Sequence, residues 1–380
     1  MSGTADGSPA PDHTVPDHTV PDHTVPVSGA ADGPQGAAVP PTLHDVAREA
    51  GVSVATASRA LNGSARNVRA ENVARVRAAA ERLGYRPHLS AQAIAKGSTR
   101  TVALVVRDVA DPYFSAIAAG VIGEAEAAGL IVTMAVAGGS PERELQIVRT
   151  LRGTRPRVVI VTGSRIDGAG TRDALVEELE AYRTAGGRVV LISQRDLPYP
   201  TVTIDNAGGA AELARALLGA GYRRFAVLHA PAALRTSRER HEGFLAGLAG
   251  SGVPEPVAVE TDFTRDGGYA AARRLAERGI GDVEAVFAVN DVMAIGAMTG
   301  LREAGVVPGA DVGVAGFDDI APAVDVVPAL TSVAVPLREA GASAVRLALS
   351  DGETGCEAGA REAGVRLSAR VILRASTPPR

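Results

Sequence analysis

The sequence predicts a multidomain chain in which a small all-α module precedes a larger α/β core of two doubly wound parallel-sheet subdomains. The 380 residues exceed the size of one typical domain. Helical periodicity marks residues 42–87, and from residue 101 short apolar runs alternate with amphipathic stretches. The charge changes at the same boundary. Residues 41–100 hold ten Arg or Lys against four Asp or Glu, whereas residues 1–40 hold five Asp and no basic residue.

The first 40 residues are predicted to be a disordered tail. They contain three copies of the unit PDHTV between Pro11 and Val25 and are rich in Pro, Gly and Asp. Because proline recurs in every repeat, no helix can align the repeated side chains. The alternative is a metal-binding tract built on His13, His18 and His23. We expect an expanded repeat without a metal site, and no cofactor anywhere in the chain.

Residues 41–87 are predicted to form a headpiece of three short helices. The first begins at Thr42, which can form a capping box with Asp45, and ends at Gly51, which suits a left-handed cap. The third spans about residues 70–83.

The second helix follows Ser53 after the tight glycine turn, so the first two helices make a helix-turn-helix. It exposes small side chains and Arg59, which suits close approach to base edges in a major groove. The alternative is a three-helix bundle without a DNA role. The basic character of residues 41–100 favours DNA binding, because phosphate contacts need a concentrated positive face.

The body of the chain is predicted to form parallel sheets covered on both faces. Near-continuous apolar strands that alternate with helices are typical of that arrangement. Eight or more strands fit two subdomains better than one, and the cleft between two such subdomains is a natural site for a small molecule. The runs span residues 101–106, 130–136, 157–163, 188–193, 224–230, 256–261, 285–290 and 312–317.

The body contains no catalytic signature. It has no G-x-S-x-G elbow, P-loop, H-E-x-x-H or Cys/His cluster, so we expect a binding protein and not an enzyme. The single Cys356 can form no internal disulfide. No run of about 18 apolar residues and no basic-apolar leader is present, which leads us to expect a cytoplasmic protein without membrane contact.

A series of motifs follows in order over residues 42–377: TLHDVAREAGVSVATASRALNGS, LGYRPHLSAQAIAKGSTRTVALVV, DPYF, IDNAGGA, GYRRFAVL, VNDVMAIGAM, VGVAGFDDI, PALTSVAVP and ILRAST. Together they resemble the lactose-repressor (LacI/GalR) family of bacterial transcription regulators. The resemblance implies a DNA-binding headpiece, a hinge helix and linker over residues 88–100, and a periplasmic-binding-protein-like core over residues 101–380. It also implies a repressor that a small effector, expected to be a sugar or sugar derivative, releases from a palindromic operator. Because no leucine-heptad segment follows ILRAST, we expect a homodimer.

The resemblance assigns a set of DNA-binding positions in the headpiece. The base-reading positions fall on Val54, Ala55 and Arg59, and Arg59 is suited to guanine O6 and N7. The positions that mostly hold phosphates or orient the helix fall on Ser53, Thr56 and Ser58, and Asn62 completes the headpiece set.

The hinge segment 88–100 is too short to be a stable helix alone in water. In the family, paired hinge helices form in the minor groove and a leucine wedges between base pairs, and the matching position here is Ile94. Lys96 is expected near the phosphates. Because isoleucine is stiffer than leucine in a helix, Ile94→Leu should tighten operator binding and Ile94→Gly should abolish it.

The effector positions of the family fall on Phe114, Arg235, Arg240, Phe263 and Asp291. Arg and Asp offer directional donors and acceptors for hydroxyls, and Phe offers a flat face to a ring. The two arginines would serve an anionic ligand, such as a sugar phosphate, or a purine equally well.

Other polar residues are left outside the effector set. Asp318 and Asp319 are interpreted as caps that follow the strand at 312–317. Ser193 and Gln194 receive no ligand role, because the sequence departs from the family pattern at that strand end.

Two other functions fit the α/β body. A solute-binding protein of a transport system would have the same core, but the basic headpiece and the absent leader argue against it. An enzyme of the doubly wound class would need the catalytic set that the sequence lacks.

Overall fold

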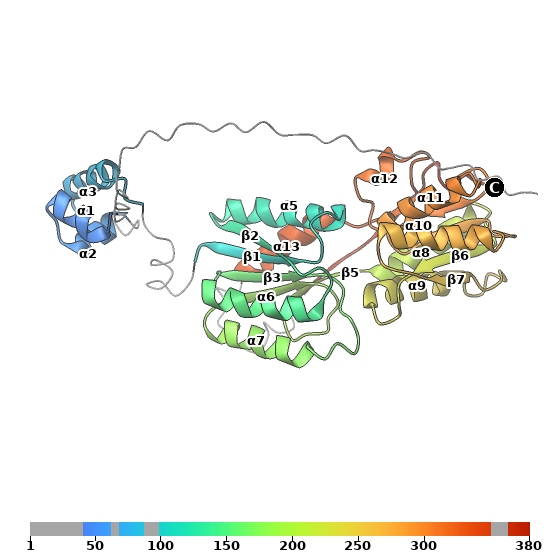
Figure 1. Ribbon diagram of the computed structural model, residues 1–380, viewed down its shortest axis with the longest axis horizontal. Coiled ribbons are helices and arrows are strands. Elements are labelled where there is room, and N and C mark those ends of the chain that lie inside the picture. Colours follow the sequence, from blue (N-terminus) through green and yellow to red (C-terminus); the bar gives the residue numbers. More distant parts are fainter. Residues whose placement is uncertain (1–40, 62–67, 87–98, 351–363) are drawn as a thin grey trace, which may run out of the picture. The chain divides into compact units, whose positions relative to one another are not determined.

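The computed structural model describes residues 41–61, 68–86, 99–350 and 364–380 (Figure 1). The chain separates into two compact units, Met1–Arg86 and Pro87–Arg380. The predicted tail, Asn62 and the hinge positions Ile94 and Lys96 lie outside the described residues.

The described part of the first unit folds into the predicted helices. The capping box is present, because the Thr42 hydroxyl accepts from the Asp45 amide and the Asp45 carboxylate accepts from the Thr42 amide. Gly51 ends the first helix in the left-handed region, with φ of 61°. The helices are α1 (Leu43–Ala50), α2 (Val54–Leu61) and α3 (Ala70–Arg82).

The headpiece core consists of small aliphatic side chains from all three helices: Val46, Ala47, Ala50, Ala57, Ala60, Val76, Ala79 and Ala80. The Ser53 hydroxyl accepts from the Thr56 amide at 3.1 Å and so caps α2, as expected. From α3, Arg75 donates to the carbonyls of Ala50 and Gly51 and holds the turn between α1 and α2.

The second unit begins with a six-stranded parallel sheet of order β11-β5-β4-β3-β1-β2. Alternate residues of β1 enter two different clusters: Val102 and Leu104 face one side of the sheet, and Ala103 and Val105 the other. The sheet is therefore covered on both faces, which confirms the doubly wound prediction. Its strands are β1 (Thr101–Val106), β2 (Ile131–Val136), β3 (Val158–Thr162), β4 (Arg188–Ile192), β5 (Thr201–Ile204) and β11 (Gly364–Leu367).

Helices cover this first sheet on both sides (Figure 1). One face packs against α5 (Pro112–Ala127) and α13 (Leu337–Ser350), and the other against α6 (Pro141–Thr154) and α7 (Arg172–Thr184). A Cβ atom at Gly120 in α5 would lie 1.9 Å from the Arg338 carbonyl oxygen of α13. The backbones of these two helices thus touch at a residue that only glycine can occupy.

A second parallel sheet has the order β7-β6-β8-β9. Its strands are β6 (Phe225–His229), β7 (Val257–Glu260), β8 (Ala285–Ala288) and β9 (Gly313–Ala315). Two helix pairs, α8 with α9 and α10 with α11, belong to this subdomain. Its helices are α8 (Asn206–Gly219), α9 (Arg235–Leu248), α10 (Arg265–Glu277), α11 (Asp291–Glu303) and α12 (Pro322–Asp325).

The chain passes between the two subdomains more than once. It leaves the first after β5 and returns to it in α13 and β11. The antiparallel pair of β10 (Ser332–Ala334) and β12 (Arg370–Ile372) lies along these crossings. The sequence pattern predicted none of β5, β10, β11 and β12, because three or four residues are too few to show a period.

Candidate functional site

Helix α2 divides its side chains by face. The Arg59 Nε donates to the Ala55 carbonyl of its own helix at 3.2 Å, and no carboxylate in the described residues pairs with this guanidinium. An available cation therefore lies along an exposed helix. Ala57 and Ala60 are buried, whereas Ser53, Ala55 and Arg59 are exposed and Val54, Thr56 and Ser58 are half-buried.

In the second unit, a cavity of about 560 Å³ lies where the strands of both sheets end. Its polar residues follow the carboxyl ends of different strands: Arg107 follows β1, Gln194 β4, Asn206 β5, Asn290 β8 and Asp318 β9. Ligands of open parallel sheets bind at this edge. The cavity, which we call the cleft, is therefore the candidate ligand site.

Arg240 of α9 stands at the centre of the cleft and is only 1% exposed. Its Nη2 donates to Asp318 Oδ1 at 2.7 Å, its Nε to Asn206 Oδ1 at 2.9 Å, and its Nη1 to the Val289 carbonyl at 2.8 Å. The guanidinium also lies 3.9 Å from the ring centroid of Phe317. This network fixes the orientation of the cation before any ligand arrives.

Carboxylates of the cleft carry the cost of burial. Burial raises the pKa of Asp318 to about 6, and the neighbouring Arg240 opposes this shift. The pKa of Asp111 is also raised by burial, against a hydrogen bond from the Tyr113 amide. A ligand hydroxyl that donates to either carboxylate would favour its ionised form.

Aromatic rings form part of the cleft wall. Tyr113 and Phe114 lie edge to face with centroids 5.0 Å apart, and Phe263 lies 5.6 Å from the Arg107 guanidinium carbon. Phe114, Arg240 and Phe263 therefore meet at one cavity, as the assigned effector positions require.

Two assigned effector residues do not line the cleft. Arg235 forms ion pairs with Asp167 and Asp196. The buried Asp291 accepts from the Ser332 hydroxyl at 2.6 Å and the Ile320 amide at 2.9 Å.

The assignment is wrong by one residue at each place, since the cleft is lined by Thr236 and Asn290. Consecutive residues at a helix start point about 100° apart, so a motif alone does not fix which of them faces the cavity.

Three residues left out of the effector set do line the cleft. Asp318 contacts Arg240, and Ser193 and Gln194 stand at the end of β4. Asp319 instead pairs with Arg374 at 2.6 Å, which agrees with a structural role. The signal that would have found the three is their position directly after a strand of a parallel sheet.

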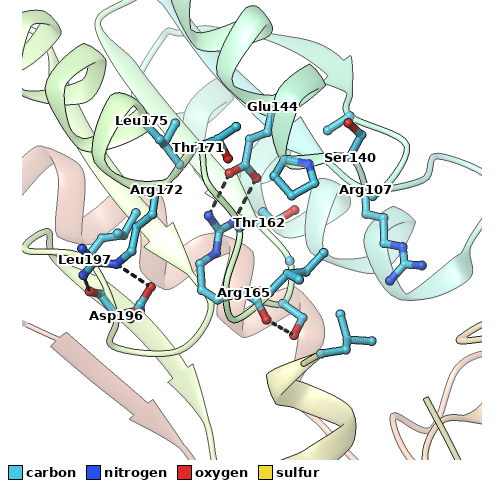
Figure 2. A pocket seen from close by; sticks show the side chains of 18 residues that line it. Arg107, Ser140, Glu144, Thr162, Arg165, Thr171, Arg172, Leu175, Asp196 and Leu197 are labelled. Atoms are coloured by element: carbon cyan, nitrogen blue, oxygen red, sulfur yellow. Dashed lines mark hydrogen bonds and ion pairs between the residues drawn. The ribbon is translucent and has the colours of Figure 1, made fainter. Parts of the chain in front are cut away.

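A second cavity, of about 680 Å³, adjoins the cleft on the side of the first sheet (Figure 2). Gly163, Ser164 and Arg107 line both cavities. The buried Arg165 makes a two-pronged ion pair with Glu144 at 2.8 and 3.0 Å.

In the part of the chain that the structure describes, no group of three His, Cys, Asp or Glu side chains is placed to hold a metal ion. Among the same residues, no helix has both the length and the apolar character needed to cross a membrane.

Comparison with known proteins agrees with both parts of this architecture. Residues 42–88 match the family of bacterial regulatory proteins, lacI family, and residues 214–377 match a periplasmic binding protein-like domain. The transcriptional regulator GalS of Salmonella typhimurium is 34% identical over 313 residues, which cover 81% of this chain and 89% of that protein. The chain belongs to the lacI family. This lacI-family protein is a DNA-binding transcription regulator and not an enzyme.

Other relatives extend the likeness over most of the lacI-family chain. The regulator CelR of Thermobifida fusca is 33% identical over 314 residues, covering 81% of this chain and 90% of that protein. The structure of the lac repressor dimer bound to operator and an anti-inducer matches with a TM-score of 0.75 and 25% identity, over 90% of this chain and 100% of that chain. A CelR–cellobiose complex matches with a TM-score of 0.63 and 30% identity, over 88% and 99%.

Proposed function

We propose that the protein is a cytoplasmic homodimeric repressor, which leaves a near-palindromic operator when a sugar-like effector binds in the cleft. The observation that carries this proposal is the cleft itself, a polar and aromatic cavity at the strand ends of both subdomains in a chain whose headpiece presents an unpaired arginine on α2. A ligand in such a place touches both subdomains and can bias their closure.

The operator contacts follow from the exposed face of α2. Arg59 is the proposed base reader, and Val54 and Ala55 offer apolar contact to thymine methyl groups. Ser53, Thr56 and Ser58 are proposed to hold phosphates or position the helix. The sequence adds Asn62 in the headpiece, and Ile94 and Lys96 in the hinge, to this set.

A neutral, sugar-like effector suits the chemistry of the cleft. The central Arg240 already has Asp318 as its counter-charge. The amides of Asn206 and Asn290 and the carboxylates of Asp111 and Asp318 offer donors and acceptors to hydroxyls, while aromatic rings offer faces to a sugar ring. The relative whose complex contains cellobiose supports the same class.

The start of the second unit shows how the cleft can act on the hinge. The Thr99 amide and hydroxyl both donate to the Arg155 carbonyl, at 2.9 and 3.0 Å, and Arg155 ends α6. The other end of α6, at Ser140, borders the second cavity. Any movement of the first subdomain therefore carries the residue that directly follows the hinge segment.

The edge of the first sheet supports a dimer. Strand β2 is an edge strand, and it exposes Ile131 by 60% and Met134 by 42%. Ile122 of the adjacent α5 is 37% exposed. Apolar side chains grouped on an edge mark an interface, and the matched lac repressor structure is described as a dimer.

Selection from random double-stranded oligonucleotides tests the proposal. The full chain should enrich a near-palindrome, with affinity that falls steeply as salt rises. A thermal-shift screen of sugars on the same preparation should find at least one that stabilises the protein. Failure to prefer any palindrome would contradict the repressor assignment.

A further inference from the structure

The second cavity, next to the cleft, is built like a binding site. Its wall carries apolar side chains, among them Pro141, Leu175, Leu197 and Leu234, together with polar groups from several loops (Figure 2). A wall of apolar surface with a few convergent polar groups is typical of small-molecule sites.

Arg165 gives the second cavity a buried charge that stability does not explain. The residue is 9% exposed, and its Nε is buried with no hydrogen-bond partner in the described residues. A buried ion pair such as Arg165–Glu144 costs desolvation and is weak evidence for stabilisation. Its position on a cavity wall points to recognition.

The charges of the second cavity cancel in pairs. Arg165 pairs with Glu144, and Arg172 pairs with Asp196 at 3.4 Å. In addition, the Thr171 hydroxyl makes no hydrogen bond within the described residues, although Thr171 precedes α7. The cavity therefore offers directional hydrogen bonds without a net charge, which suits a neutral polyhydroxyl unit.

The two cavities adjoin at a short partition. The Ser164 hydroxyl accepts from the Thr236 amide at 3.0 Å, which ties the loop after β3 to α9 across the subdomains. Past this contact, Gly163 and Arg107 line both spaces. Gly163 has no side chain to close the passage.

We infer that the effector is a neutral saccharide of at least two units, with one unit in the cleft and the next in the second cavity. This inference rests on the proposed function, because it takes the cleft as the effector site. Arg107 lies at the junction and is placed to donate to the linkage between the two units or to their flanking hydroxyls.

Calorimetric titration of the full chain tests the inference with matched sugars. The panel is cellobiose, maltose, lactose and melibiose, against glucose and galactose as their component units and glucose 6-phosphate as an anionic probe. At least one disaccharide should bind about tenfold or more tightly than either of its units. A monosaccharide that binds as tightly as every disaccharide, or glucose 6-phosphate binding more tightly than all of them, overturns the inference.

Variants locate the second unit. Ala169→Trp adds bulk on the wall of the second cavity and should reduce the disaccharide's advantage to less than about threefold. Asp173→Trp is the matched control, since its side chain is 98% exposed and does not line the cavity, and it should keep the advantage.

The double variant Arg165→Gln with Glu144→Gln removes both charges together and should also lose the disaccharide's advantage. Full retention of that advantage in both Ala169→Trp and the double variant overturns the inference.

The outcomes separate this inference from the proposed function. If a monosaccharide binds and no disaccharide gains, the two-unit inference fails and the proposed sugar effector stands. If no saccharide binds at all, both fail, while the operator selection still decides the DNA-binding role.

Discussion

Individual residues of the two sites differ in how firmly the protein holds them. Arg240 is fixed by three hydrogen bonds and an aromatic face before a ligand arrives. Arg59 makes one hydrogen bond to its own helix and remains available to DNA. A preorganised group lowers the cost of binding a small ligand, whereas a mobile cation adapts to a base edge.

Arg59→Ala should weaken operator binding by about 1–3 kcal/mol and relax the preference at one base pair, because the bidentate contact to guanine is lost. Fluorescence anisotropy with the selected operator and its single-base variants measures both effects. Arg48→Ala is the matched control, since Arg48 is a 77% exposed arginine on α1. Equal loss in the two variants, without a change of base preference, would remove Arg59 from base reading.

Effector binding should strengthen as pH rises through about 6. The folded pKa of Asp318, about 6, lies above the ordinary value of 3.8. The ionised carboxylate is therefore disfavoured in the free protein, and its contribution to stability is largest below pH 3.8 and is lost as pH rises through 6. A ligand hydroxyl that donates to this carboxylate binds the ionised form, which predicts roughly tenfold tighter binding at pH 7.5 than at pH 5.

Calorimetry across this pH range checks the prediction, and Asp318→Asn should flatten the profile. An unchanged slope in the variant would assign the pH dependence to another group.

At the scale of elements, long periodic segments were predictable and short ones were not. The headpiece helices and eight strands follow from apolar periodicity, and the capping box of α1 from Thr42 and Asp45 alone. The three-residue β10 and β12 carry no period of their own. They form because α13 returns to the first subdomain, a contact distant in sequence that no local pattern encodes.

The contact between α5 and α13 gives a test at this scale. Gly120→Ala should destabilise the protein by about 1–3 kcal/mol, because its Cβ would overlap the Arg338 carbonyl. Gly123→Ala on the same helix meets nothing within 4 Å and should be neutral or stabilising by up to about 1 kcal/mol. Urea denaturation at one protein concentration measures both, and similar midpoints for the two variants would contradict this packing.

At the scale of the whole molecule, the site could be predicted in kind but not residue by residue. The sequence predicted a cleft between two parallel sheets, and Phe114, Arg240 and Phe263 meet there. It misplaced Arg235 and Asp291, whose partners come from loops distant in sequence. Arg235 joins the two subdomains through Asp167 and Asp196, so its role belongs to their closure.

Met134→Glu should convert the dimer to a monomer and weaken operator binding, because the proposed interface would bury an unpaired carboxylate. Val257→Glu places the same charge on an exposed apolar position of β7, the edge strand of the other sheet, and should leave the dimer intact. Sedimentation velocity distinguishes the two. A dimeric Met134→Glu protein would move the interface away from β2.

The central claim is that one chain couples a sugar in the cleft to an operator on the headpiece. Its most direct test is the affinity for the selected operator, measured at fixed salt with and without a saturating concentration of the tightest-binding saccharide. The account predicts at least about a tenfold loss of operator affinity, and an equal loss of saccharide affinity when the operator is bound. Operator affinity that is unchanged by the bound saccharide would contradict it.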